Sequence, residues 1–203
     1  MTRVIGVVLA GGQARRMGGG DKGALLLGGE TMLARVIARL APQVESIVLN
    51  ANGDPARFAD YGLPVVADSI AEYPGPLAGV LAGLDHAATV GASHVISAAA
   101  DTPFFPRDLA ERLAEGAATQ AHPIALAATH EEGRTMRHPT FGLWPVALRE
   151  DLRAALNDGL RKVVLWTDRH GAAQVVFPAG TFFNINAPED LAAAHARLEE
   201  DAT

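Results

Sequence analysis

Two arginines, a lysine and five glycines are concentrated in Leu9–Lys22, a stretch that follows the uncharged apolar run Val4–Leu9. Glycine lets backbone amides approach an anion closely, and successive amides in a turn form a concave site for phosphate. Arg15, Arg16 and Lys22 add positive charge to the same loop. Glycine-rich turns are also common as plain loops, but a buried strand that runs into a basic glycine loop favours phosphate binding.

The spacing within this loop excludes two common phosphate-binding motifs. A Walker A loop places Gly before its Lys and Ser or Thr after it, whereas here Asp21 precedes Lys22 and Gly23 follows it. The dinucleotide fingerprint Gly-x-Gly-x-x-Gly is absent after this strand, since Gly11 and Gly12 are adjacent. The loop therefore belongs to another class of phosphate-binding turn.

Polar side chains also stand directly after other short apolar segments, as Asn50, Asp68 and Asp101 do. Ligands of open α/β sheets bind beyond the carboxyl ends of the strands, so Gly11, Asn50 and Asp68 are expected at one site. A carboxylate at the end of a buried strand, such as Asp101, suits Mg²⁺, which is usually held by one or two carboxylates and by substrate phosphates.

The elements that must position these residues alternate along the chain. Strands are predicted over residues 4–9, 46–49, 63–67, 94–100, 124–129, 137–144 and 175–177, and helices over 31–40, 55–61, 76–88, 106–116 and 146–156. Strand–helix–strand alternation predicts right-handed crossovers between neighbouring parallel strands. The expected fold class is therefore α/β, with three layers: a mostly parallel twisted sheet and helices on both of its faces.

Length and composition narrow the class of protein. The 203 residues suit one domain, expected to span 1–203, and the 49% of hydrophobic residues suffice for a large core. A net charge of -6 argues against nucleic acid as a partner, and the lack of cysteine excludes disulfides and thiolate chemistry. We see no signal peptide and no apolar run that would span a bilayer, so no membrane association and a cytoplasmic location are expected.

The pattern Leu-Ala-Gly-Gly-x-x-x-Arg-Met-Gly-Gly-x-Asp-Lys at residues 9–22 resembles the signature loop of the molybdopterin nucleotidyltransferase family, and in detail that of molybdenum cofactor guanylyltransferases. Related cytidylyltransferases usually begin this loop with Leu-Ala-Ala-Gly, from which Gly11-Gly12 departs. Later segments also resemble the family: Asp68 with Pro74-Gly75-Pro76-Leu77-x-Gly79, then Asp101-Thr102-Pro103, 138–144, 159–163 and 184–191.

The resemblance implies a reaction and a role for each matching residue. The terminal phosphate of a molybdenum-loaded molybdopterin attacks the α-phosphorus of GTP, pyrophosphate leaves, and Mg²⁺ on Asp101 bridges phosphate oxygens. The implied catalytic residues are Lys22, Arg16 and Asp101, and the implied nucleotide-binding residues are Leu9, Ala10, Gly11, Gly12, Lys22, Asn50, Asp68 and Asp101. The residues implied on the acceptor side are Arg137, His138, Arg161, Lys162, Asn184 and Asn186.

The resemblance also divides the single nucleotidyltransferase domain. Residues of about 1–100 are expected to bind the nucleotide, and residues of about 101–203 to form the metal and acceptor side. Proteins that insert molybdenum or mature molybdoenzymes are the expected partners. One departure concerns Ala187, where the family commonly has Thr, a good N-cap, so the last helix is expected to lose about 1 kcal/mol.

Several alternatives stay open from the residues alone. The segment 138–144 also reads as a core strand, Arg161-Lys162 as a solvated basic pair, and the asparagines at 184 and 186 as turn formers. A cytidylyltransferase or a sugar-phosphate nucleotidyltransferase of the same fold is the nearest rival function. A non-catalytic module that senses nucleotides is a rival of another class.

Overall fold

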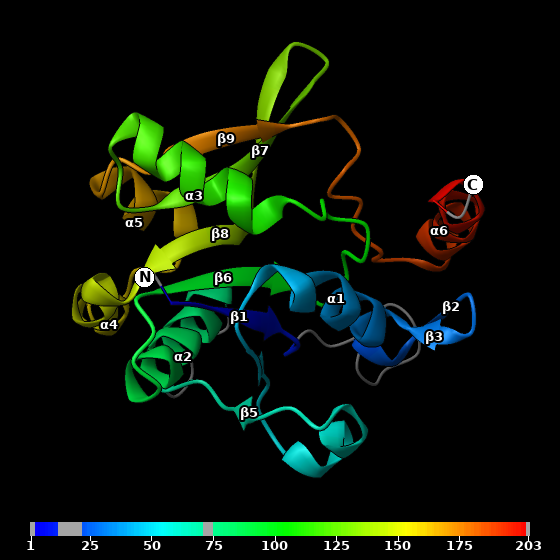
Figure 1. Cartoon of the computed structure of the whole chain (residues 1–203), viewed down its shortest axis with the longest axis horizontal. Coiled ribbons are helices and arrows are strands. Elements are labelled where there is room, and N and C mark those ends of the chain that lie inside the picture. The colour runs from blue at the N-terminus through cyan, green and yellow to red at the C-terminus, as the bar shows by residue number, and fades with distance from the viewer. Residues whose placement is uncertain (1–2, 12–21, 71–74, 202–203) are drawn as a thin grey trace.

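The computed structural model describes residues 3–11, 22–70 and 75–201, with the side chains of Lys22, Pro188 and residues 199–201 left undescribed. Within this part, one seven-stranded sheet has the order β5-β4-β1-β6-β8-β7-β9 (Figure 1). Its strands are β1 (Val4–Leu9), β4 (Ile47–Asn50), β5 (Val65–Val66), β6 (His94–Ala99), β7 (Ala125–Glu131), β8 (Arg134–Pro145) and β9 (Ala173–Phe177). A small antiparallel pair, β2 (Leu26–Leu27) and β3 (Glu30–Thr31), lies apart from it.

Strand directions confirm the mostly parallel sheet. β1 is parallel to its neighbours β4 and β6, and β4 is parallel to β5. β8 runs antiparallel to both β6 and β7, and β9 is parallel to β7. The carboxyl ends of β1, β4, β5 and β6 therefore meet at one edge of the sheet, and β8 enters the sheet from that edge.

Two hydrophobic cores lie on the two faces of the sheet, and β1 shows why. Its side chains alternate, so Val8 packs in one core while Ile5 and Val7 pack in the other. The first core is covered by α1 (Met32–Leu40) and α3 (Leu109–Gln120), and the second by α2 (Pro76–Thr89), α4 (Arg149–Asn157) and α5 (Val163–Arg169). This arrangement confirms the three-layer α/β fold.

Helix α1 follows directly from its sequence. Met32, Leu33, Val36 and Leu40 recur at helical spacing and are all buried, so one face of the helix packs against the sheet. Thr31 caps it, since its hydroxyl accepts a hydrogen bond from the backbone N–H of Ala34 at 3.1 Å. The helix predicted over 31–40 is therefore confirmed, with Thr31 as its cap.

The last helix, α6 (Pro188–Asp201), is capped differently from the family pattern. One carboxylate oxygen of Asp190 accepts hydrogen bonds from the backbone N–H groups of Asn186 and Ala187, at 2.8 and 2.9 Å. This is the reaching-back half of a capping box. Asp190 thus satisfies two amides near the helix start. These bonds offset part of the stability that is lost because residue 187 is Ala rather than Thr.

Other element boundaries differ from the expectation in small ways. The strand predicted over 63–67 shortens to β5, which pairs on one side only because it lies at the edge of the sheet. Residues 55–61 and 146–148 form 3-10 turns, η4 (Pro55–Tyr61) and η5 (Val146–Leu148). Helix α3 begins at Leu109 rather than 106, because the N–H of Leu109 closes a turn onto the carbonyl of Pro106.

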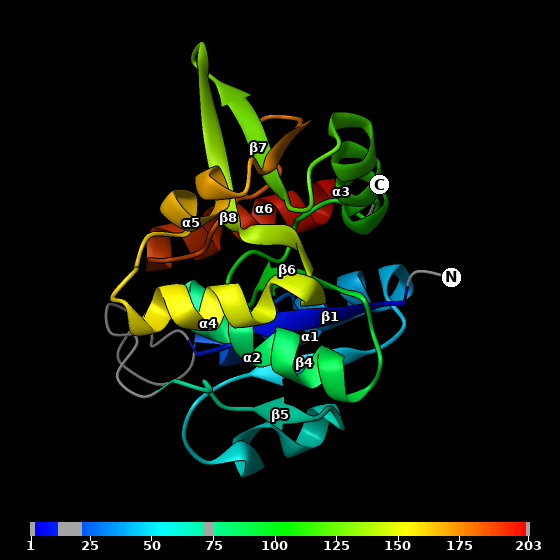
Figure 2. The ribbon, with the colours of Figure 1, turned by 90° about the vertical axis from the view of Figure 1, so that its left-hand side faces the viewer.

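A long hairpin joins β7 to β8 and stands clear of the rest of the molecule (Figures 1 and 2). Its turn places Glu132 and Gly133 at φ of 49° and 75°. Positive φ at both central residues is the geometry that two-residue hairpins prefer. Residues 130–134 therefore form the end of a true hairpin. None of the described helices is long and apolar enough to cross a membrane.

Candidate active site

The strand order reverses at β1, and the candidate site lies there. From β1 the chain adds β4 and β5 on one side and then β6 on the other. Leu9 at the end of β1 pairs with Asn50 and Ala99, and the next amide, that of Ala10, bonds to the carbonyl of Asn50 at 2.9 Å. Open α/β sheets bind ligands beyond the carboxyl ends of strands at such a reversal. Leu9, Ala10 and Gly11 lie at this point, whereas Gly12 and Arg16 fall outside the described residues.

Asn50 and Asp68 lie together at this edge, as their strand-end positions predict. The side-chain amide of Asn50 donates to one carboxylate oxygen of Asp68 at 2.9 Å and is also within reach of the carbonyl of Val66 at 3.3 Å. Asn50 is buried and Asp68 is half-buried. The carboxylate of Asp68 is therefore fixed at the mouth of the site by a neighbouring strand.

Asn52 completes this cluster, although the sequence alone did not single it out. Its side-chain amide donates to the other oxygen of Asp68 at 2.8 Å, and its side-chain carbonyl accepts from the backbone N–H of Asp68 at 2.9 Å. Asp68 is thus held at three atoms. The available signal was the Asn50-Ala51-Asn52 spacing, because side chains two apart on extended backbone face the same way.

Helix α2 reaches the same cluster through Gly79, a residue of the predicted second motif. A Cβ built at Gly79 would stand 2.2 Å from the side-chain oxygen of Asn50 and 2.7 Å from Leu9. Any other residue at this position would have to displace the side chains of Asn50 and Leu9. The glycine of Pro-Gly-Pro-Leu-x-Gly therefore lets a buried helix pack closely against the end of β1 and Asn50.

Asp101 follows β6 at the other side of β1, where its carboxylate is half-buried. The hydroxyl of buried Thr102 donates to its Oδ1 at 3.3 Å, and its backbone carbonyl accepts from the N–H of Ile185 at 2.9 Å. The bond to Ile185 brings the C-terminal Asn-x-Asn segment to Asp101. Ile185 is buried, whereas Asn184 is exposed and Asn186 is half-buried. Ile185 therefore anchors the segment, and the two asparagines flank it.

The donor set at Asp101 fits Mg²⁺ held with the help of substrate phosphates. Over the described residues, no group of three or more His, Asp or Glu side chains gathers closely enough to hold a metal ion by itself. Mg²⁺ commonly takes one or two carboxylates and completes its octahedron with water and phosphate oxygens. A single half-buried carboxylate beyond the end of β6 is compatible with that arrangement.

Arg137 and His138 lie on β8 beyond its pairing with β6, and both make structural contacts. Arg137 pairs with Asp168 of α5 at 2.7 Å. His138 shares a hydrogen bond of 2.9 Å with Thr129 and stacks on Phe182 with ring centroids 4.5 Å apart. Burial lowers the pKa of the His138 imidazole, and the nearby Glu131 carboxylate partly opposes this shift. A neutral imidazole suits packing and hydrogen bonding more than the binding of a phosphate.

Arg161 and Lys162 are exposed in the loop between α4 and α5. They line a pocket of about 440 Å³ together with Arg169 and the acidic Asp158, so three cations and one carboxylate border the same space. A Cβ at Gly75 would stand 4.0 Å from the carbonyl of Arg161, which places this loop beside the start of α2. The pair therefore lies near the nucleotide-side helix, in a position compatible with an anionic substrate group.

Similarity to known proteins shows the family to which the chain belongs. The model of the MobA-like NTP transferase domain matches residues 6–172. The chain belongs to this family of nucleotidyltransferases. It is 54% identical over 195 residues to a molybdenum cofactor guanylyltransferase of Nitrobacter hamburgensis. The aligned region covers 93% of this chain and 91% of that protein. Its identity to one from Cereibacter sphaeroides is 52%, over 98% of this chain and all of that protein.

A solved structure shows the same fold. The molybdopterin-guanine dinucleotide biosynthesis protein A of Archaeoglobus fulgidus superimposes with a TM-score of 0.74, over 97% of this chain and 99% of that one. The two sequences are 22% identical, so this likeness bears on architecture alone. The family model and the curated relatives confirm the family resemblance expected from the motifs at residues 9–22 and beyond.

Proposed function

We propose that this chain transfers GMP from GTP to the terminal phosphate of molybdopterin and releases pyrophosphate. The observation that carries the proposal is the agreement along nearly the whole chain with relatives named molybdenum cofactor guanylyltransferase, at 50% identity or more. The fold alone would also suit a cytidylyltransferase or a sugar-phosphate nucleotidyltransferase, but these relatives do not favour either.

On the nucleotide side, Leu9, Ala10 and Gly11 are proposed to line the nucleotide at the strand reversal, where the N–H of Ala10 already bonds to Asn50, and Asp68 offers a carboxylate. Asn50 and Asn52 already donate to both oxygens of Asp68, so its orientation is set before any ligand arrives. A carboxylate so held accepts hydrogen bonds from hydroxyl or amino groups of a nucleoside. Preorganisation of this kind reduces the ordering that binding would otherwise require.

On the phosphate side, Asp101 is proposed to ligate Mg²⁺, and Lys22 and Arg16 to contact the phosphates. Mg²⁺ bound there would neutralise phosphate charge as the pyrophosphate leaves. Lys22 and Arg16 add positive charge to the same groups, which stabilises the charge that develops on the leaving group. The attacking phosphate is already ionised, so no general base is required and the residues act mainly by positioning.

On the acceptor side, Asn184 and Asn186 are the residues that the geometry supports best. Both flank Ile185, whose N–H bonds to the carbonyl of Asp101. Their amides can therefore reach a substrate phosphate that approaches Asp101. Arg161 and Lys162 are proposed to meet the acceptor from the other side. The residues that Arg137 and His138 contact make a positioning role for them the simpler proposal.

The first experiment measures pyrophosphate release with Mg²⁺ and molybdenum-loaded molybdopterin, using GTP and CTP in separate reactions. Release with GTP alone is expected. Release with CTP alone would overturn the assignment of the base, and release with neither would favour sugar phosphates or a non-catalytic nucleotide sensor. The cytoplasmic location and the partner proteins stay predictions, which co-purification from cell fractions would test.

A further inference from the structure

Asp85 of α2 joins two segments that lie far from it in the sequence. Its Oδ2 accepts a hydrogen bond from the hydroxyl of Ser69 at 2.6 Å. Its Oδ1 accepts one from a terminal nitrogen of Arg153 of α4 at 2.5 Å and lies 3.5 Å from Nε of Arg149. Ser69 directly follows Asp68, the carboxylate that the strand ends hold at the candidate site. Asp85 therefore connects helix α4 with the segment that carries Asp68.

The two oxygens of the Asp85 carboxylate have different partners, and this division sets its orientation. Both arginines of α4 lie at Oδ1, which leaves Oδ2 directed at Ser69. Arg149 and Arg153 also pair with Glu150, at 2.8 and 3.1 Å, so these three charged side chains of α4 belong to one network with Asp85. Helix α4 lies alongside α2 in Figure 2. The network thus anchors the carboxylate on the neighbouring helix.

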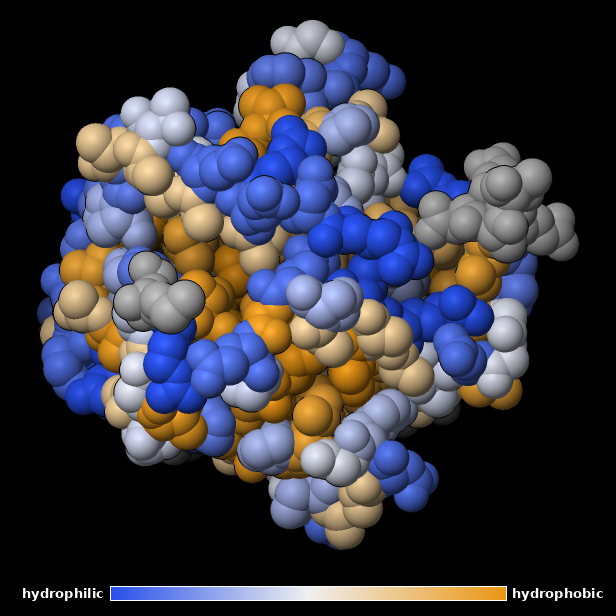
Figure 3. All heavy atoms as spheres, in the orientation of Figure 1, coloured by the Kyte–Doolittle hydropathy of each residue, from blue (hydrophilic) through white to orange (hydrophobic). Residues whose placement is uncertain are grey.

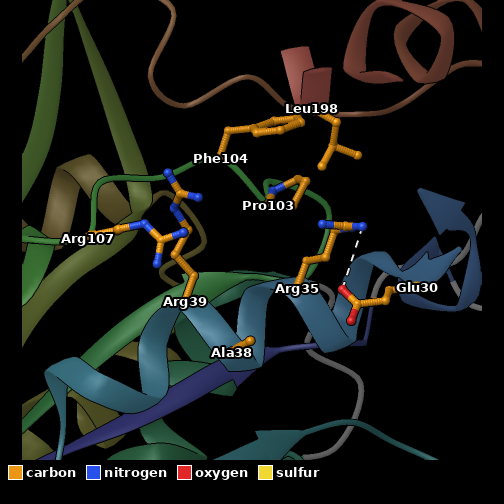
Figure 4. A pocket seen from close by; sticks show the side chains of 8 residues that line it. All are labelled: Glu30, Arg35, Ala38, Arg39, Pro103, Phe104, Arg107 and Leu198. Carbon is orange, nitrogen blue, oxygen red and sulfur yellow. Dashed lines mark ion pairs between the residues drawn. The ribbon is translucent and has the colours of Figure 1, made fainter. Parts of the chain in front are cut away.

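An arginine on the opposite face of the sheet is bound differently. In a pocket of about 260 Å³ between α1 and α6, Arg35 donates to the carbonyls of Leu27 and Gly28 at 2.7 and 3.2 Å. Glu30 lies 3.6 Å from Arg35 there, and its side chain is 62% exposed (Figure 4). Figure 3 shows hydrophilic side chains gathered between α1 and α6. The Asp85 side chain is only 27% exposed, so water and salt screen its ion pairs less than that of Glu30.

The segment that carries Asp68 is fixed at three successive residues. The N–H of Asp68 donates to the side-chain oxygen of Asn52 at 2.9 Å, and Ile70 packs against the second core. Between them, the hydroxyl of Ser69 is held by Asp85. A peptide unit is planar, so movement at Ser69 reaches Asp68 across one rigid unit. Release of Ser69 would therefore loosen the backbone next to the Asp68 carboxylate.

We propose that Asp85 is a positioning residue for GMP transfer, which holds Ser69 and thereby keeps Asp68 in the orientation that receives the nucleotide. Because Asp68 contacts the nucleotide in the proposed function, this role of Asp85 rests on that function. Asn50 and Asn52 fix the carboxylate from the strand ends, whereas Asp85 fixes its backbone from the helix layer. Asp68 is thus set from two layers before a ligand arrives, which reduces the ordering that binding requires.

Ser69→Ala separates this role from a purely structural bond between α2 and α4, because it leaves the ion pairs of Asp85 intact. We expect the KM for GTP to rise about fivefold in pyrophosphate release, with kcat and the KM for molybdopterin nearly unchanged. Ser69→Thr keeps the hydroxyl and should restore the KM. Ser93→Ala is the matched control and should change neither KM. It removes another exposed serine hydroxyl, which bonds to the carbonyl of Arg3 beside the amino ends of β1 and β6.

A double-mutant cycle and an exchange measurement complete the test. In an Asp85→Ala background, Ser69→Ala should raise the KM for GTP no further, because the partner of Ser69 is already gone. The backbone N–H of Asp68 should exchange with solvent about fivefold faster in Ser69→Ala than in the unaltered chain, as followed by NMR. In Ser93→Ala it should exchange at the unaltered rate.

Three kinetic results would overturn the proposal: an unchanged KM for GTP in Ser69→Ala, an equal rise in Ser93→Ala, or the full effect of Ser69→Ala in the Asp85→Ala background. An unchanged exchange rate of the Asp68 N–H in Ser69→Ala would overturn it as well. The exchange measurement needs no substrate, so it decides whether Asp85 holds Asp68 even if the unaltered chain fails to transfer GMP. Failure of the proposed function is therefore distinguishable from failure of the hold on Asp68.

Discussion

On the proposed nucleotide side of the site, Asp68 accepts hydrogen bonds from Asn50 and Asn52 at 2.9 and 2.8 Å. On the proposed acceptor side, Arg137 is paired with Asp168 at 2.7 Å, and His138 bonds to Thr129 and stacks on Phe182. The polar residues on the proposed nucleotide side bond to one another at the strand ends. Those on the proposed acceptor side hold the C-terminal elements together.

Strand direction explains this difference. β1, β4, β5 and β6 are parallel, so their carboxyl ends bring neighbouring side chains to one edge. β8 is antiparallel to β6, so Arg137 and His138 precede the part of their strand that pairs with β6 and pair instead with β7. A polar residue at the end of a parallel strand is thus a better guide to a site than one within an antiparallel strand.

The largest expected effect is at Asp101, which lies between the two sides. Asp101→Asn keeps the size of the side chain but removes the charge that would ligate Mg²⁺. We expect kcat/KM for GTP to fall by about 10³-fold or more. Pyrophosphate release at increasing Mg²⁺ measures this. Full turnover in the variant, with its fold verified by circular dichroism, would remove Asp101 from the metal site.

Gly79→Ala tests how closely the nucleotide side is packed. Its Cβ would meet Asn50 at 2.2 Å, so we expect a loss of about 1–3 kcal/mol in unfolding free energy. We also expect about a tenfold rise in KM for GTP. Gly83→Ala is the matched control on the same helix, since its Cβ would meet Val7 at 2.9 Å inside the core. Equal KM values in the two variants would break the link between Gly79 and the nucleotide.

A pair of asparagine variants separates the two sides of the site. Asn52→Ala removes the bonds to Asp68, each worth about 1 kcal/mol, so the KM for GTP should rise about fivefold to tenfold with kcat nearly unchanged. Asn184→Ala should instead raise the KM for molybdopterin and leave that for GTP unchanged. Steady-state kinetics with each substrate varied in turn measures both. The opposite pattern would reverse the assignment of sides.

The smallest effect is expected at the Arg137–Asp168 pair. Their side chains are 31% and 57% exposed, and such pairs contribute about 0–1 kcal/mol to stability. If the pair is only structural, Arg137→Gln and Asp168→Asn should lower the unfolding free energy alike in urea titrations, with the KM for molybdopterin unchanged in both. A rise in that KM in Arg137→Gln alone would return Arg137 to the acceptor site.

The sequence predicted which polar residues lie together at the strand ends, while their role in binding a nucleotide stays a prediction. Gly11, Asn50 and Asp68 were expected at one edge because each follows a strand, and the pairing of Leu9 with Asn50 places them there. Asn52 was missed because one extra asparagine after a strand is also an ordinary turn residue. On the C-terminal side, the motifs pointed to Arg137 and His138 but did not predict what these residues contact. Their partners Asp168 and Phe182 lie 31 and 44 residues away in the sequence.

What the sequence by itself determined was local: apolar periodicity for the strands and α1, glycines for the loop, and the order of elements that makes a parallel sheet. The tertiary structure decided which polar groups meet. Asp101 and Ile185 are joined by a backbone hydrogen bond that no periodicity predicts. Arg39 donates through Nε to the carbonyl of Phe105, 66 residues further along the chain, and only the folded chain brings these two groups together. Long-range contacts of this kind arise from packing, which the local pattern does not encode.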